Sequence, residues 1–225
     1  MIVKRAITPR ENLIIAESFS LFNREETAKG FVKKILVWTF VFEFTGALLL
    51  ATRFIPRFGW VDGIYKSVFH SVSAFCNAGF DILGPDSLIG FSGDYIVVFT
   101  ISALIIIGGI GFFIWFDISS GFKRKKFSAY TKLVLITTAV LLVSGTAATL
   151  ILEWDNTLAG MSVAEKISAS FAHSVSLRTA GFAFFDNASM TDALKLLHKT
   201  LISSPVLPNT LLSTKRLTVN PLKSL

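Results

Sequence analysis

Long uncharged apolar runs dominate the middle of the chain. One extends from Tyr95 to Phe116 over 22 residues, and another extends from Leu133 to Leu152 over 20 residues. A helix needs about 20 predominantly apolar residues to cross a bilayer. A third, slightly shorter run begins at Ile35 and continues to about Thr52. The pattern predicts an all-α polytopic membrane protein with three spanning helices in this part of the chain.

Shorter apolar stretches follow the first and the last of these spans. Gly63 to Cys76 covers about 14 residues and follows Asp62, a candidate helix N-cap. The other continues to about Leu177 and follows Ser162 to Glu165, which has the pattern of a capping box. Both stretches are too short to cross a membrane, so we expect two re-entrant helices that enter and end within it.

The order of span, short helix and glycine-containing strand occurs twice. FHSVSAFCNAGF (Phe69 to Phe80) aligns without a gap with FAHSVSLRTAGF (Phe171 to Phe182) at an offset of 102, although the HSVS letters are displaced by one residue. Thr45-Gly46-Ala47 aligns with Ser144-Gly145-Thr146 at an offset of 99. These matches indicate that one supersecondary unit has been duplicated.

Composition and charge support a membrane protein and give its expected orientation. With 52% hydrophobic and only 16% charged residues, the chain does not resemble a soluble domain. The net charge of +7 comes from basic residues beside the apolar runs, which argues against nucleic acid as a partner. Residues 1–34 carry seven Lys or Arg against four acids, whereas Asp81 to Asp94 carries three acids and no base. The positive-inside rule therefore predicts a cytoplasmic N-terminus.

The two glycine strands are the candidate functional site. A helix that ends inside the membrane leaves its last carbonyls unpaired and directs the negative end of its dipole at whatever follows. Glycine then lets successive carbonyls turn toward an axis and replace the hydration shell of a cation. The alternative is an ordinary loop glycine at a helix C-terminus. The candidate ion-binding residues are Asn77, Ala78, Gly79, Phe80, Thr179, Ala180, Gly181 and Phe182.

Three segments resemble one family, the membrane subunits of the Trk/Ktr/HKT potassium transporters, and most closely the bacterial KtrB type. They are SVFHSVSAFCNAGFD (Ser67 to Asp81), IIIGGIGFF (Ile105 to Phe113) and HSVSLRTAGF (His173 to Phe182). The resemblance implies four membrane-pore-membrane repeats with one filter glycine each. It also implies potassium uptake across the bacterial cell membrane, a homodimer and a cytosolic nucleotide-binding regulatory subunit of the KtrA type. No cofactor or enzymatic activity is expected, and sodium is a candidate coupling ion.

The expected organisation has five parts, which are a cytoplasmic segment (1–34), a complete repeat (35–118), a basic cytoplasmic loop (119–132), a partial repeat (133–194) and an atypical basic tail (195–225). The resemblance implies a further repeat before Met1 to Asn23. A span shifted by 102 would fall on Leu197 to Thr218, where two prolines and several charges argue against a membrane helix. A frameshifted or truncated chain would explain both departures, and a non-conducting membrane remnant is therefore the alternative function.

Other singled-out residues have structural and functional interpretations. Glu43 must face protein, pair or be protonated if it lies within a span. His70 and His173 are expected to pack, because no nearby pattern of ligands or bases indicates metal binding or an intramembrane enzyme. Gly108, Gly109 and Gly111 could form a hinge, but close helix packing is favoured. Arg178 is expected to bind helix-end carbonyls or a buried acid behind the strand.

Overall fold

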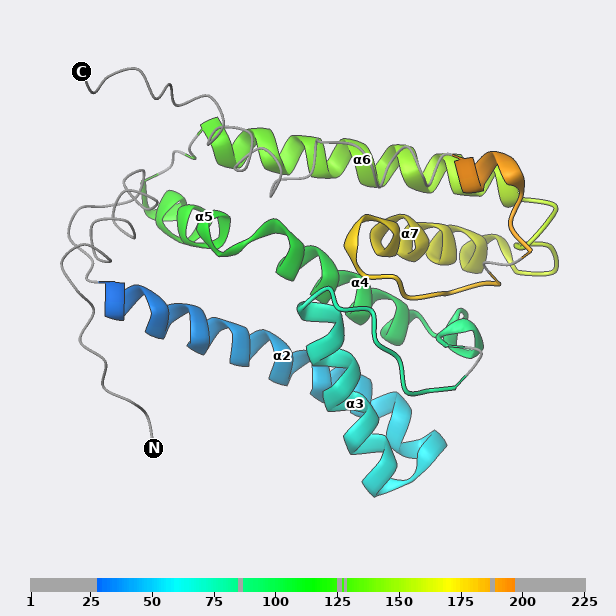
Figure 1. The fold of residues 1–225 in the computed structure, drawn as a ribbon, viewed down its shortest axis with the longest axis horizontal. Helices are drawn as coiled ribbons and strands as arrows, with labels where there is room; N and C mark the ends of the chain where they lie inside the picture. The colour runs from blue at the N-terminus through cyan, green and yellow to red at the C-terminus, as the bar shows by residue number, and fades with distance from the viewer. Residues whose placement is uncertain (1–27, 85–86, 125–126, 128, 187–188, 197–225) are drawn as a thin grey trace, which may run out of the picture. The chain divides into compact units, whose positions relative to one another are not determined.

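The computed structural model describes residues 28–84, 87–124, 127, 129–186 and 189–196 (Figure 1). In these ranges all regular secondary structure is helical, which confirms the predicted fold class. The chain divides into two compact units, residues 1–42 and residues 43–225, with the boundary inside the first described helix. The elements are α2 (Ala28–Phe58), α3 (Trp60–Phe75), the 3₁₀ turn η1 (Ile89–Phe91), α4 (Tyr95–Ile110), α5 (Phe112–Arg124), α6 (Ala129–Glu153) and α7 (Val163–Thr179).

Two of the described helices are long and apolar enough to cross a membrane. They contain the candidate spans Val32–Phe58, of 27 residues, and Thr131–Glu153, of 23 residues. Both correspond to spans expected from the sequence. The basic N-terminal segment before residue 28 and the tail from residue 197 lie outside the described residues.

The first turn between a span and a short helix is tighter than expected. Helix α2 continues through Pro56 to Phe58, and Gly59, with φ of +84°, separates it from α3. Gly59 is the N-cap of α3, and Asp62 lies in its first turn. The prediction that Asp62 caps a helix beginning at Gly63 is therefore wrong, because a single glycine with a positive φ reverses the chain earlier.

The apolar run from Tyr95 to Phe116 is not one continuous helix. Gly111 has φ of +91° and separates α4 from α5. Trp115 Nε1 donates a hydrogen bond to the carbonyl of Ile107 at 3.0 Å, so a side chain of α5 satisfies a carbonyl in the last turn of α4. The expected continuous span is thus wrong, because length and hydropathy do not reveal a helix break. Helix α5 also continues to Arg124, into the segment expected to be a loop.

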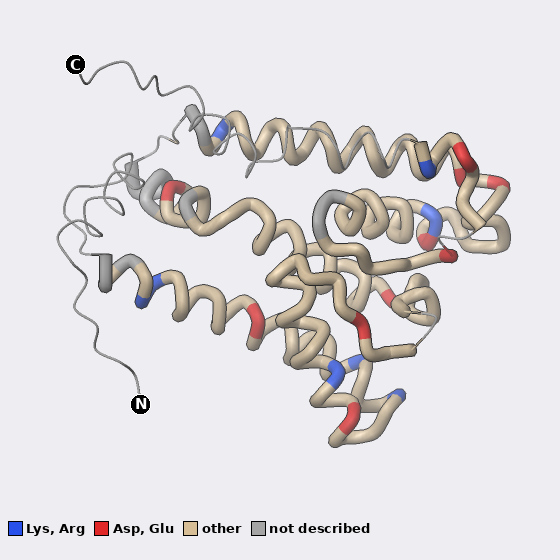
Figure 2. The backbone as a smooth tube through the Cα atoms, in the orientation of Figure 1, with Lys and Arg blue, Asp and Glu red and all other residues tan. Residues whose placement is uncertain are grey.

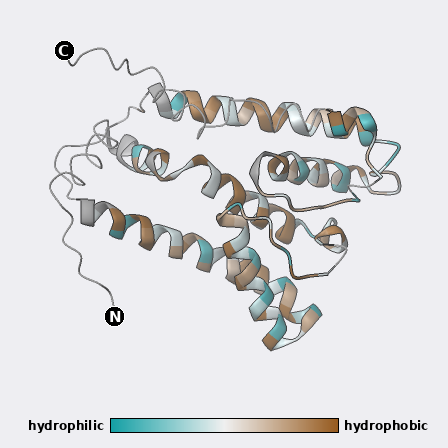
Figure 3. Ribbon diagram, viewed as in Figure 1, coloured by the Kyte–Doolittle hydropathy of each residue, from teal (hydrophilic) through white to brown (hydrophobic). Residues whose placement is uncertain are grey.

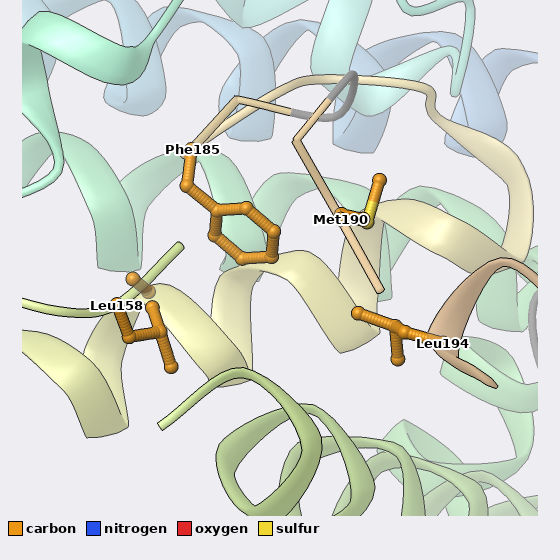
Figure 4. Close-up of a cluster of buried hydrophobic side chains, with 5 residues drawn as sticks. Leu158, Phe185, Met190 and Leu194 are labelled. Carbon is orange, nitrogen blue, oxygen red and sulfur yellow. The ribbon is translucent and has the colours of Figure 1, made fainter. Parts of the chain in front are cut away.

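Helix α4 packs against both short helices, α3 and α7, and α7 also packs against α6 (Figure 1). Charged residues are absent from α4, and α6 is uncharged between Lys132 and Glu153, as Figures 2 and 3 show. A buried cluster joins the loop after α6, helix α7 and the segment after the second glycine strand (Figure 4). Its members are Leu158, Ala169, Phe185, Met190 and Leu194.

The capping box at the start of α7 is confirmed. Glu165 N–H donates to Ser162 Oγ at 3.4 Å, and Ser162 N–H donates to Glu165 Oε2 at 2.8 Å. These two bonds satisfy one backbone donor in the first helical turn and one at the N-cap itself. Helix α7 is thereby defined at one end by its cap and at the other by the glycine strand.

Candidate functional site

The first glycine strand leaves the C-terminus of α3. Ala78 N–H donates to the carbonyl of Ser73 at 2.9 Å, so the chain turns back over the last helical turn. Asn77 and Gly79 both have positive φ, of +54° and +71°. Asparagine tolerates this left-handed region and glycine adopts it freely. Residues 77–80 therefore have an irregular backbone.

The second glycine strand begins one residue later than predicted, because Thr179 is the last residue of α7 and Ala180 is its C-cap. The N–H groups of Ala180 and Gly181 both donate to the carbonyl of Ser176, at 2.9 and 3.1 Å. Gly181 has φ of +74°, and Ala180 and Phe182 are buried. The side chain of Thr179 lies outside the description, so any role for it remains a prediction.

The structure brings the two glycine strands together. A Cβ atom added at Gly79 would overlap the carbonyl oxygen of Ala180 and would lie 3.5 Å from the Cα of Gly181. Just beyond the strands, Leu88 N–H donates to the carbonyl of Ala183 at 3.2 Å. Two loops about a hundred positions apart in the sequence are therefore in direct backbone contact.

The span of the first repeat holds its short helix through a glycine and a serine. Ser71 Oγ, on α3, donates to the carbonyl of Glu43, on α2, at 2.6 Å. One turn along α2, a Cβ added at Gly46 would lie 2.6 Å from the same serine oxygen. The absence of a side chain at Gly46 is what lets α3 approach this closely.

The second repeat makes the same contact. Ser174 Oγ, on α7, donates to the carbonyl of Leu142, on α6, at 3.1 Å, and a Cβ at Gly145 would overlap that serine oxygen. The spans correspond at an offset of 99, as the sequence predicts, but the two serines correspond at 103. The ungapped alignment is thus wrong along the short helices, and a one-residue gap is needed before the shared Ala-Gly-Phe.

His70, on α3, is fully buried. Its Nδ1 is 2.7 Å from the carbonyl of Lys66, its Nε2 is 3.3 Å from Asp81 Oδ1, and its ring is 6.3 Å from that of Phe182. Burial raises the pKa of Asp81, but hydrogen bonds from His70, Ser87 and the backbone outweigh this effect and hold the pKa below its ordinary value. His70 therefore packs, as expected, but it also has a carboxylate partner in Asp81 that the sequence did not predict.

His173 has different surroundings from its counterpart. Its ring is buried and lies 4.3 Å from the ring of Phe185. Ala183 occupies the place that corresponds to Asp81 at the offset of 102. The repeats therefore share a glycine with a positive φ, but they differ in the backbone before it, where Asn77 has φ of +54° and Thr179 is helical, and in the side chains behind the strands.

Two further predictions concern the first repeat: Glu43 should face protein, and the glycines of α4 should allow close helix packing. Contacts within the chain agree with both for Glu43 and Gly108. Glu43 is partly buried, and its Oε1 lies 3.9 Å from Cys76 Sγ. A Cβ added at Gly108 would overlap the carbonyl of Phe75, so this glycine allows close packing of α4 against α3. Gly111, by contrast, is the helix break. The side chain of Arg178 lies outside the description, so its expected role remains a prediction.

Glu153, at the end of α6, was not singled out from the sequence. It is fully buried, and its two oxygens accept hydrogen bonds from the backbone and hydroxyl of Thr191 at 2.8 and 2.6 Å and from Asn156 at 2.8 Å. The carboxylate thus holds the chain beyond the second strand against α6. The sequence gives little indication of this role, because Glu153 and Thr191 are 38 positions apart and meet only in the folded chain.

Comparison with known proteins identifies the family. Residues 25–219 match the TrkH family, described as cation transport protein, and the chain belongs to this family. It is 39% identical over 196 residues to the potassium/sodium uptake protein NtpJ of Enterococcus hirae, covering 85% of this chain and 42% of that protein. It is 36% identical over 197 residues to the Ktr system potassium uptake protein B of Bacillus subtilis, covering 85% and 43%. The chain thus spans about two fifths of the length of these relatives.

Proposed function

We propose that this chain forms part of a potassium uptake pathway, in which the strands 77–80 and 179–182 contribute backbone carbonyls to one cation filter. The main support for this proposal is the direct contact between Gly79, which follows α3, and the Ala180–Gly181 peptide, which follows α7. Two such strands enclose only part of an axis. Further repeats of the same kind would complete the ring of carbonyls.

The relatives' names support the choice of ion. NtpJ is named as a potassium/sodium uptake protein and the Ktr protein as a potassium uptake protein. We propose potassium as the transported ion and sodium as the coupling ion, with no covalent chemistry. The distribution of basic residues supports a cytoplasmic N-terminus. A homodimer and a cytosolic nucleotide-binding subunit complete the proposed assembly.

Testing the filter requires a protein with all repeats. Because the chain spans 43% of the Bacillus subtilis relative, residues 25–194 can replace the matching segment of that protein. The chimera is expressed in a bacterium that lacks its own potassium uptake, and initial uptake rates are measured against potassium and sodium concentrations. Selectivity is defined as the KM for sodium divided by the KM for potassium.

Gly181→Ser and Gly160→Ser form a matched pair for this test. Both glycines have positive φ, of +74° and +84°, and among the described residues a Cβ at either would meet no atom within 4 Å. The backbone strain is therefore similar, but only Gly181 belongs to a proposed filter strand. We expect Gly181→Ser to lower selectivity and Gly160→Ser to leave it unchanged. Equal selectivity in the two variants would show that the strand at Gly181 does not contact the ion.

A further inference from the structure

Ser73 and Ser176 make a second pair of equivalent contacts, behind the glycine strands. Ser73 Oγ donates to the carbonyl of Phe80 at 2.8 Å, and Ser176 Oγ donates to the carbonyl of Phe182 at 2.7 Å. The serines are buried, and each accepting carbonyl belongs to the residue directly after the strand's glycine. The same bond therefore occurs in both repeats, despite the one-residue difference in length between serine and phenylalanine.

These hydroxyls do not make the bond that a helical serine usually makes. Serine within a helix commonly returns its hydrogen bond to a carbonyl three or four residues earlier. Ser67 and Ser168 do so, bonding the carbonyls of Gly63 and Glu165 at 2.6 and 3.0 Å. Ser73 instead donates forward, out of its helix, to a strand whose peptide planes no regular secondary structure fixes.

Each serine holds its strand on both sides of the glycine. The backbone carbonyl of Ser73 accepts from Ala78 N–H at 2.9 Å, while its hydroxyl binds the carbonyl of Phe80. In the second repeat the carbonyl of Ser176 accepts from Ala180 and Gly181, and its hydroxyl binds Phe182. The peptide units around the glycine are thereby tied to one helical residue at both ends.

We infer that Ser73 and Ser176 are positioning residues for ion selectivity. Their hydroxyls fix the direction of the last carbonyl of each strand and so limit rotation of the peptide units around the glycine. This inference rests on the proposed filter function. Without the hydroxyl, the strand can widen or turn its carbonyls, and a site that replaces the potassium hydration shell less well discriminates less against sodium.

Ser71 and Ser174 provide matched controls two residues earlier on the same helices. Like the positioning serines, they are buried and donate to a backbone carbonyl, but that carbonyl belongs to a span and not to a strand. Ser73→Ala and Ser71→Ala thus remove similar hydrogen bonds, and only the first bond touches the strand. The same comparison applies to Ser176→Ala and Ser174→Ala.

The four alanine variants and Ser73→Thr are tested in the chimera, with uptake normalised to the amount of protein in the membrane. We expect Ser73→Ala and Ser176→Ala to lower selectivity by about two- to tenfold, the size expected for one hydrogen bond. Ser73→Thr keeps the hydroxyl and should recover most of the loss. Ser71→Ala and Ser174→Ala should lower the amount of folded protein without changing selectivity.

The inference is overturned if Ser73→Ala and Ser71→Ala change selectivity equally, if neither changes it, or if threonine gives no recovery. Should Ser73→Ala fail to reach the membrane, the comparison between Ser176→Ala and Ser174→Ala decides in the same way. Gly181→Ser is measured in parallel. If that variant keeps its selectivity, the proposed filter itself is wrong; if it loses selectivity while the serine variants do not, only the serine assignment is wrong.

Discussion

At the residue scale, the two glycines of the proposed filter have similar φ angles but different neighbours. Gly79 contacts the backbone of the other strand, whereas a Cβ at Gly181 would enter open space among the described residues. The sequence could identify both glycines from the repeated Ala-Gly-Phe, but not this difference. It arises only when the two loops are folded against each other.

This difference predicts the order of two alanine substitutions. Gly181→Ala should cost about 1–2 kcal/mol, the strain of an alanine in a left-handed conformation. Gly79→Ala should cost more, because its methyl group also displaces the peptide of Ala180. Thermal unfolding of the purified chain in detergent measures both. Equal losses, or a larger loss at Gly181, would contradict the contact between the strands.

Glu153 leads to a second prediction at this scale. Glu153→Ala should reduce stability by about 3 kcal/mol, because several partly buried donors lose a charged acceptor. We also expect faster proteolysis between Ser189 and Leu196, because Glu153 binds Thr191 within this segment. Asp155→Ala, an exposed acid two residues away, is the control and should behave like the unmodified chain. Equal protease sensitivity in the two variants would show that Glu153 does not hold this segment.

At the scale of the elements, apolar length and capping pattern predicted which stretches form helices. They did not predict where each helix begins and ends. The sequence predicted the short helices and the cap at Ser162, because these depend on neighbouring residues. It missed the break at Gly111 and the early start of α3 after Gly59. In both cases one glycine with a positive φ interrupts an apolar stretch, and hydropathy gives no sign of it.

The packing of each short helix on its span can be tested at Gly145. Gly145→Val should destabilise the contact between α6 and α7 by about 1–3 kcal/mol, because the added side chain would occupy the place of Ser174. Ala147→Val adds similar bulk at an exposed position of α6 and is the control. Unfolding by heat in detergent measures the difference. Equal stability of the two variants would contradict the close approach of α7.

The cap of α7 predicts a pH dependence. Ser162→Ala should cost about 1 kcal/mol. Bonds from the backbone and the hydroxyl of Ser162 hold the pKa of Glu165 below its ordinary value. A carboxylate with a lowered folded-state pKa stabilises the fold above its ordinary pKa and loses this effect as pH falls through the lowered value. The difference between unmodified and Ser162→Ala chains should therefore be largest at neutral pH and shrink in acid. A difference that grows in acid would contradict the capping box.

At the scale of the whole molecule, the sequence predicts a duplicated order of span, short helix and strand, and the two proposed repeats make matching glycine–serine contacts. The exact register was not predictable, because one residue is missing between the short helix and the glycine of the second repeat. The side chains behind the strands also differ between the repeats, since Ala183 corresponds to Asp81. The importance of this difference is seen only in the folded chain.

The two glycine strands are proposed to bind the same cation, and the effect of that cation on thermal stability is a direct test. A cation that binds only the folded protein raises its melting temperature, and at equal concentration the tighter-binding cation raises it more. Thermal unfolding of the purified chimera is therefore measured in potassium and in sodium salts of equal concentration. We predict a higher melting temperature in potassium for the unmodified chimera and for Gly160→Ser, and no such difference for Gly181→Ser. An undiminished potassium effect in Gly181→Ser would contradict the assignment of the ion to these strands.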